Sequence, residues 1–119
     1  MSKYADVYLL PVKADKIDEY KKMARYAAKV FKKHGALKYR EYVGSDLNSE
    51  WTKPFTKVIK LKDDEVLVYA AVEFKSESHR NKAMKAIMND PEMQPPPGME
   101  MPFNPKSMVY GGFKVLVDL

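Results

Sequence analysis

A ten-residue alternation from Glu65 to Phe74 constrains the fold of this chain more than any other stretch. Its even positions, Val66 to Phe74, are all apolar, whereas its odd positions, Leu67 to Glu73, mix large amphipathic side chains with a carboxylate. A period of two is typical of a β-strand whose faces meet different surroundings. Because burying each larger apolar side chain contributes roughly 1.5 to 3 kcal/mol, we expect helices over the even positions. The odd positions are expected to face a cavity or a partner.

Five further segments extend this strand into an ordered series of elements. The predicted strands cover 5–12, 37–43 and 108–118, and the predicted helices begin near Asp15 and Ser76 and end near His34 and Asn89. Asp15 and Ser76 are suitable N-caps, and Gly35 follows the first helix where a left-handed C-cap is expected.

Three irregular features accompany these elements. Gly111 and Gly112 lie inside the last strand and indicate a bulge or a close approach by another backbone or a ligand. Between Asp90 and Pro105, prolines crowd together with methionines, which predicts a semi-rigid flap whose thioethers pack onto the body of the protein. The long loop before the central strand contains the only tryptophan, Trp51, which we expect to pack as an anchor.

Strand, helix, strand, strand, helix, strand is the order of the split βαβ layout. We therefore predict one α+β domain over residues 1–119, with an antiparallel sheet and both helices on one face. Right-handed crossovers place the first and third strands in the centre. The other face is expected to expose an apolar patch made of Tyr8, Leu10, Leu67, Tyr69 and one of Tyr39 and Tyr42. Since monomers rarely leave such a patch in water, we predict a face-to-face homodimer.

Composition and charge exclude several classes of protein. The 119 residues contain no cysteine, so neither a disulfide nor a thiolate metal site is expected. No signal-peptide pattern and no apolar run of ~20 residues is found, so we expect a cytoplasmic protein with no membrane partner. The formal net charge is +5. Much of the excess lies between Lys13 and Lys33 in a pattern typical of a solvated helix face, so we do not expect nucleic-acid binding.

Five sequence segments form a specific pattern when taken together, although each alone is weak. They are Ala5 to Val12, His34 to Tyr39, Ser78 to Arg80, Met88 to Pro91, and above all Met108 to Asp118. This set resembles the YbaA-like family of small uncharacterised bacterial proteins, which contain domain of unknown function 1428. The resemblance covers nearly the whole chain and implies a ferredoxin-like βαββαβ fold assembled as a dimeric α/β barrel. It supplies no activity and no catalytic residues to carry over.

The two histidines, His34 and His79, have no obvious third partner, so no metal site is predicted. His34 is expected to contact the carbonyls at the end of the first helix. His79 is expected to be solvated or hydrogen-bonded near Ser76. By fold analogy alone, His79 lies where a haem ligand could be found, but Asp6 and Tyr69 do not suit such a site, so no cofactor is predicted.

A set of carboxylates and hydroxyls remains: Glu41, Glu73, Tyr8, Tyr69 and Tyr110. These groups suit a cofactor-free oxygenase or isomerase if their strands bring them to one face, and otherwise suit cross-strand pairing and dimer contact.

We predict a homodimer that binds a small, partly apolar organic ligand between sheet and helices, with catalysis undecided. The predicted pocket residues are Tyr8, Tyr69, Glu73, His79 and Tyr110. The alternative is a non-enzymatic interaction or stress-related dimer with no small-molecule pocket.

Overall fold

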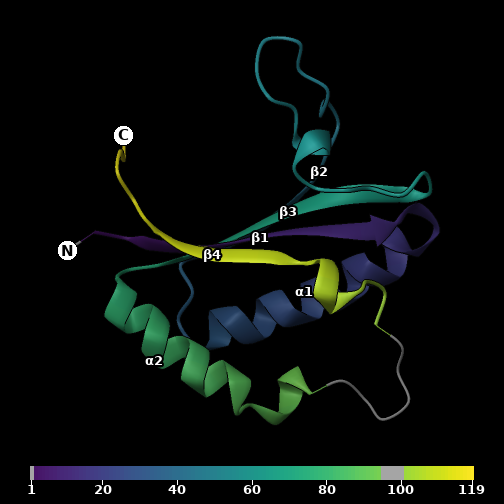
Figure 1. The fold of residues 1–119 in the computed structure, drawn as a ribbon. Coiled ribbons are helices and arrows are strands. Elements are labelled where there is room, and N and C mark those ends of the chain that lie inside the picture. The colour runs from purple at the N-terminus through teal and green to yellow at the C-terminus, as the bar shows by residue number, and fades with distance from the viewer. Residues whose placement is uncertain (1, 95–100) are drawn as a thin grey trace.

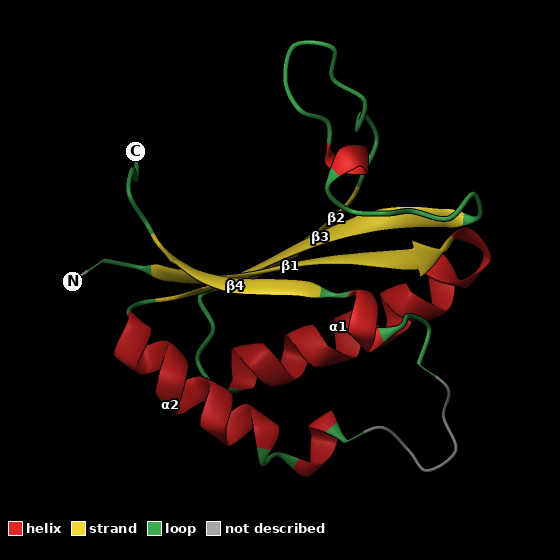
Figure 2. Ribbon diagram, in the orientation of Figure 1, coloured by secondary structure: helices red, strands yellow, loops and turns green. Residues whose placement is uncertain are grey.

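The computed structural model describes residues 2–94 and 101–119 of the chain. Its helices and strands follow the predicted order: β1 (Tyr4–Lys13), α1 (Ile17–Lys33), β2 (Lys38–Val43), β3 (Glu65–Phe74), α2 (Glu77–Met88) and β4 (Val109–Lys114). The strands form one antiparallel sheet in the order β2-β3-β1-β4, and both helices cover the same face of it (Figures 1 and 2). The predicted α+β architecture is confirmed, with the first and third strands in the centre.

Local sequence signals place most of the element boundaries. The side chain of Ser76 accepts a hydrogen bond from the backbone N–H of His79 at 3.1 Å, which caps α2 as predicted. Gly35 has a φ of 101° just after α1, in the left-handed region predicted for it. β4 ends at Lys114 and is therefore shorter than predicted. Part of the predicted proline-rich flap, residues 95–100, lies outside the described residues.

The core lies between the helices and the sheet as two adjoining clusters. The first joins α1, α2 and β3 through the buried residues Val30, Phe31, Ala36, Val72, Phe74, Ala83 and Ile87. The second joins α1, β1 and β3 through the buried residues Leu10, Val12, Tyr20 and Val68. Tyr8 packs against both clusters. The apolar positions of β3 from Val68 to Phe74 therefore lie under the helices, as the alternation predicts.

We call the side of the sheet away from both helices the outer face. One apolar row crosses all four strands there through Tyr42, Tyr69, Leu9 and Val109. The rings of Tyr42 and Tyr69 lie 5.6 Å apart between centroids, and Phe113 on β4 adds a ring that is 58% exposed. The outer face therefore carries an apolar row. Tyr42, Leu67 and Tyr69 lie on this face as predicted, whereas Leu9, Val109 and Phe113 were not predicted for it.

Tyr8 and Leu10 were predicted for the outer face and lie under the helices instead. The pairing register places Tyr8 opposite Ala70 and Leu10 opposite Val68, both on the helix side. Sequence pattern did not separate the two faces of β1 because both alternate sets are comparably apolar, and the set that faces the helices contains a charged residue, Asp6. The prediction was wrong for these two side chains.

The segment 44–64 between β2 and β3, which we call the arm, extends away from the sheet on the outer side (Figure 1). Leu67 lies on the outer face but is only 3% exposed, close to where the arm joins the sheet, and Ile59 of the arm is also buried. A Cβ added to Gly44 would lie 2.8 Å from the side chain of Leu47, so the glycine permits close packing at the base of the arm.

Candidate functional site

One row of side chains crosses the helix face of the sheet at the level of Ala70. The register pairs Ala70 with Glu41 on β2 and with Tyr8 on β1, and pairs Tyr8 with Tyr110 on β4. The rings of Tyr8 and Tyr110 lie 5.0 Å apart between centroids, at an interplanar angle of 34°. The sheet thus brings one carboxylate and two hydroxyl groups of the predicted acid–base set to one face.

A groove of about 450 Å³ lies between α1 and the edge strand β2. Its lining residues are Ile17, Asp18, Tyr20, Lys21, Ala24, Arg25, Ala28, Tyr39, Glu41, Tyr42, Val43 and Val68. The small side chains of Ala24 and Ala28 leave the helix wall of the groove shallow, and Lys21 and Arg25 place cationic groups at it. The volume lies within the range of roughly 300 to 1,000 Å³ that is usual for small-molecule sites.

Glu41 and Asp18 are the carboxylates of this groove, and two tyrosines donate hydrogen bonds to Glu41. The hydroxyl of Tyr20 on α1 donates to Oε1, and that of Tyr39 on β2 donates to Oε2 at 2.6 Å. Burial and the contact with Glu41 raise the pKa of both hydroxyls above the ordinary tyrosine value. Both tyrosines are therefore kept protonated, as hydrogen-bond donors that hold the carboxylate in one orientation.

A second polar cluster surrounds Asp6, a fully buried carboxylate near the start of β1. Its Oδ1 accepts a hydrogen bond from the Tyr110 hydroxyl at 3.1 Å and lies 3.3 Å from Nε of Arg80 on α2. Burial raises the pKa of Asp6, an effect that Arg80 and Tyr110 partly oppose. Arg80 also donates to the hydroxyl of Tyr4 at 2.7 Å and lies over its ring at 4.6 Å. The cluster ties α2 to β1 and β4.

Gly112 makes this cluster possible. A Cβ at that position would lie 2.1 Å from the hydroxyl oxygen of Tyr4 and 2.8 Å from Nη2 of Arg80. The groups that approach Gly112 closely are the side chains of Tyr4 and Arg80, and not the backbone or ligand that was predicted. No bulge interrupts the pairing of β1 and β4 over the described ladder, which runs continuously from Tyr4 to Leu9 on β1.

The five predicted pocket residues do not lie together. Tyr8 and Tyr110 lie on the helix face, whereas Tyr69 and Glu73 lie on the outer face, opposite Leu9 and Ala5 of β1. His79 lies at the start of α2, with its ring 5.9 Å from that of Phe74 between centroids. None of the five lines the groove between α1 and β2.

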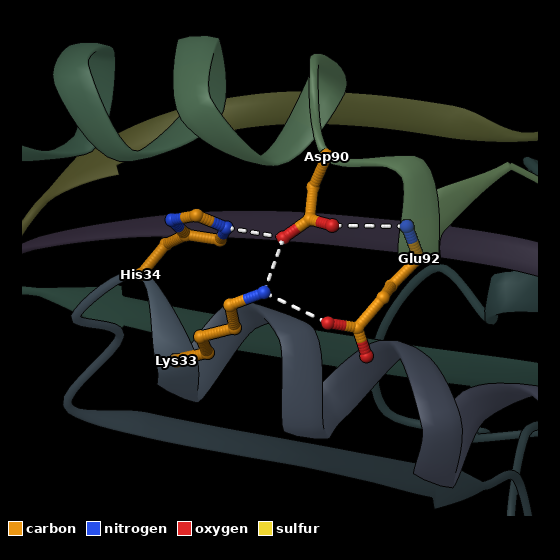
Figure 3. A network of polar contacts seen from close by, with 4 residues as sticks. All are labelled: Lys33, His34, Asp90 and Glu92. Carbon is orange, nitrogen blue, oxygen red and sulfur yellow. Dashed lines mark hydrogen bonds and ion pairs between the residues drawn. The ribbon is translucent and has the colours of Figure 1, made fainter.

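His34 differs from its prediction, because its ring contacts a carboxylate and not the helix carbonyls (Figure 3). Its Nε2 lies 2.6 Å from Oδ2 of Asp90, which also accepts a hydrogen bond from Nζ of Lys33 at 3.0 Å. Lys33 in turn contacts Glu92 at 2.8 Å, and the backbone N–H of Glu92 donates to Asp90 at 2.9 Å. The hydrogen bonds from His34, Glu92 and Lys33 lower the pKa of Asp90 below its ordinary value. The network connects the end of α1 to the segment after α2.

Sequence reasoning missed the partners of both carboxylates. Glu41 was one of several possible bases, but Tyr20 and Tyr39 were not assigned to it, and Asp6 was not connected with Arg80. The available signal was a lone acid among apolar residues of one strand face: Glu41 follows Tyr39 at spacing two, and Asp6 precedes Tyr8 at the same spacing. A buried carboxylate needs hydrogen-bond donors, so such a position predicts a polar partner from another element.

The described part of the chain has neither a cluster of metal-ligating side chains nor a membrane-spanning helix. Over residues 2–94 and 101–119, no group of three or more histidine, cysteine, aspartate or glutamate side chains is placed to hold a metal ion. Within the same residues, no helix has the length and apolar character required to cross a membrane.

Comparisons with known proteins agree with this fold. Residues 3–105 match the family model described as protein of unknown function (DUF1428). The chain is 38% identical over 116 residues to uncharacterized protein YbaA of Escherichia coli strain K12, and equally similar to that of Shigella flexneri, with 98% of each chain covered. A crystal structure of a dimeric ferredoxin-like protein from an uncultured marine organism matches with a TM-score of 0.57 and 15% identity over the whole of both chains. The fold is ferredoxin-like, and the chain belongs to the DUF1428 family.

Proposed function

We propose that the protein is a homodimer in which each protomer binds a small, partly apolar organic molecule in the groove between α1 and β2. The observation that carries this proposal is the groove itself, a space of about 450 Å³ beside an otherwise packed helix–sheet interior. Its walls are largely aliphatic and aromatic, and two of its hydroxyl groups, those of Tyr20 and Tyr39, donate hydrogen bonds to Glu41. Such a combination of apolar walls with a few positioned polar groups is usual for small-molecule sites.

The groove also supports a chemical role for the carboxylate. A ligand hydroxyl or amine that reaches Glu41 replaces one tyrosine hydroxyl as hydrogen-bond donor, and the released tyrosine then donates to a ligand oxygen. This arrangement supplies a base and hydroxyl donors around an apolar body, which is what a cofactor-free isomerase or oxygenase requires. We propose Glu41 as the proton-transfer group, with Tyr20 and Tyr39 as its hydrogen-bond donors.

The dimer is proposed to form through the outer face. The apolar row of Tyr42, Tyr69, Leu9 and Val109 supports a face-to-face contact. The structural relative of the same fold is described as dimeric, which supports the same assembly here. In this arrangement Tyr69 and Glu73 are dimer contacts, while Tyr8 and Tyr110 stay with the helix face of each protomer.

Ligand binding is tested by titrating the protein with phenol, benzoate and 4-hydroxybenzoate and following backbone amide signals by NMR. We expect 4-hydroxybenzoate and phenol to shift the signals of residues 17–28 and 39–43. Because a hydrogen bond to a charged group contributes about 1.5 to 3 kcal/mol, Glu41→Gln should weaken binding roughly tenfold or more. Glu73→Gln is the matched control on the outer face and should leave binding unchanged. Ala28→Leu, which fills the groove, should abolish binding.

The second candidate is an interaction dimer with no small-molecule pocket, and the exposed apolar outer face favours it. The same titration separates the two functions. Scattered or absent shifts with all three probes, together with a stable dimer, would contradict the ligand-binding proposal and favour this candidate. Equal binding by the wild type and by Glu41→Gln would remove the acid–base role from Glu41.

A further inference from the structure

The only tryptophan of the chain, Trp51, lies on the arm and is 95% exposed in the protomer. Indole is the largest apolar side chain, and a soluble protein rarely holds one almost entirely in water without a partner for it. Two more apolar side chains of the arm are exposed with it, Phe55 and Val58. The expected anchoring role of Trp51 is thus not fulfilled inside the protomer.

The arm is braced, so the exposure of Trp51 is a feature of an ordered segment. The hydroxyl of Ser49 accepts hydrogen bonds from the backbone N–H groups of Trp51 and Thr52, at 3.2 and 3.3 Å. The hydroxyl of Thr56 donates to the side-chain oxygen of Asn48 at 2.9 Å, which connects the outgoing and returning limbs of the arm. These contacts hold the backbone on both sides of Trp51 in one conformation.

The C-terminal segment 115–119 leaves the sheet on the same side as the arm (Figure 1). The backbone N–H of Val115 donates to the carbonyl of Lys3 at 3.0 Å, and the ammonium of Lys3 lies 3.4 Å from the carboxylate of Asp118. Leu116 is 95% exposed. The apolar outer face therefore lies between two raised segments that each carry an exposed apolar side chain.

We infer that the arm of each protomer clasps a second copy of this chain docked on the outer face, with Trp51 buried against that copy. This inference rests on the proposed dimer and adds to it the element that holds the two copies together. A second copy is the occupant because a two-fold face-to-face contact pairs the apolar row with itself and places each arm beside the other protomer. The outer face carries Lys38 and Arg40 on β2 and Glu65 and Glu73 on β3, so both signs of charge are available for contacts between two copies.

The fluorescence of Trp51 shows whether its side chain is buried, because the emission of the protein's single indole responds to exposure to water. We expect short-wavelength emission and weak quenching by acrylamide in the dimer, and a shift to long wavelength with strong quenching on dilution below the dissociation constant. The variant Tyr69→Asp, which places a charge in the outer face, should show the long-wavelength emission at every concentration. Light scattering or sedimentation on the same samples gives the oligomeric state.

Trp51→Ala should weaken dimerisation roughly 30-fold, the effect usual for a buried interface tryptophan, without changing the thermal stability of the monomeric Tyr69→Asp background. Trp51→Phe should retain part of the affinity, because it keeps an aromatic ring. Three outcomes would overturn the inference: a dimer whose Trp51 stays exposed, a Trp51→Ala variant that dimerises like the wild type, or short-wavelength emission from the Tyr69→Asp monomer. The first two leave the proposed dimer intact, whereas a protein that is monomeric at its highest attainable concentration removes both.

Discussion

The two faces of one sheet are built from similar kinds of residue but differ in what covers them. Phe74 on the helix face is fully buried, whereas Phe113 on the outer face is 58% exposed. The helix face also contains the two carboxylates with tyrosine donors, Glu41 and Asp6. The outer face has an apolar row and two raised flanking segments. The helix face therefore carries the core and the proposed ligand groove, whereas the outer face carries the proposed dimer contact.

The largest expected difference between the faces is in the free energy of unfolding. Phe74→Ala should lower it by about 3 to 5 kcal/mol, because the substitution removes a fully buried ring from the core. Phe113→Ala, the matched change on the outer face, should change it by no more than about 0.5 kcal/mol. Urea unfolding in the monomeric Tyr69→Asp background measures both.

If Phe74→Ala does not fold, Ile87→Val tests the same core, with an expected loss of about 0.5 to 1.5 kcal/mol in the free energy of unfolding. Equal losses for the two phenylalanines would contradict the division of roles.

The second difference is in association. Tyr69→Asp should weaken the dimer by at least about 2 kcal/mol, or roughly 30-fold, since it introduces a charge into the centre of an apolar contact. Tyr26→Asp is the control, because Tyr26 is an exposed tyrosine on α1. Sedimentation equilibrium gives both dissociation constants. A dimer that tolerates Tyr69→Asp, or one that is disrupted equally by Tyr26→Asp, would place the interface elsewhere.

Gly111 and Gly112 are adjacent on β4 and lie on opposite faces of the sheet, so substitutions at them compare the two faces within one strand. Gly112→Ala should destabilise the protein by about 1 to 3 kcal/mol, because the new methyl group would lie 2.1 Å from the Tyr4 hydroxyl and displace the cluster around Arg80. At Gly111 the nearest atom would be 3.4 Å away, in the ring of Phe113, so Gly111→Ala should have a much smaller effect. Thermal unfolding of the two variants is the measurement. A greater loss for Gly111→Ala would contradict this account.

The smallest expected effect is the pH dependence of the network at the end of α1 (Figure 3). Because the pKa of Asp90 is lowered in the folded state, its contribution to stability is complete above the ordinary carboxyl pKa of about 4 and is lost as pH falls through the lowered value. The melting temperature of the wild type should therefore be higher than that of Asp90→Asn at pH 7. This difference in melting temperature should shrink on acidification. Asp46→Asn in the exposed arm is the control. A difference that stays constant from pH 7 to strongly acidic solution would show that Asp90 acts through packing alone.

The candidate site was only partly predictable from the sequence. The alternation of 37–43 places Tyr39 and Glu41 on one face of a strand, which is a local property of the backbone. The contact of Glu41 with Tyr20 joins β2 to α1, and the groove exists because α1 crosses the sheet where Ala24 and Ala28 face the edge strand. No spacing within either segment specifies where two elements distant in sequence meet.

The sequence by itself determined the order of elements, the caps at Ser76 and Gly35, and the buried side of β3, because each depends on residues close together along the chain. The tertiary structure alone decided which side of β1 faces the helices. Both sides are apolar enough to be buried, and the side that carries Asp6 faces the helices, where Arg80 and Tyr110 supply partners for its carboxylate. A buried charge is stable only when another part of the fold brings a compensating group to it, and that meeting is a property of the assembled sheet and helices.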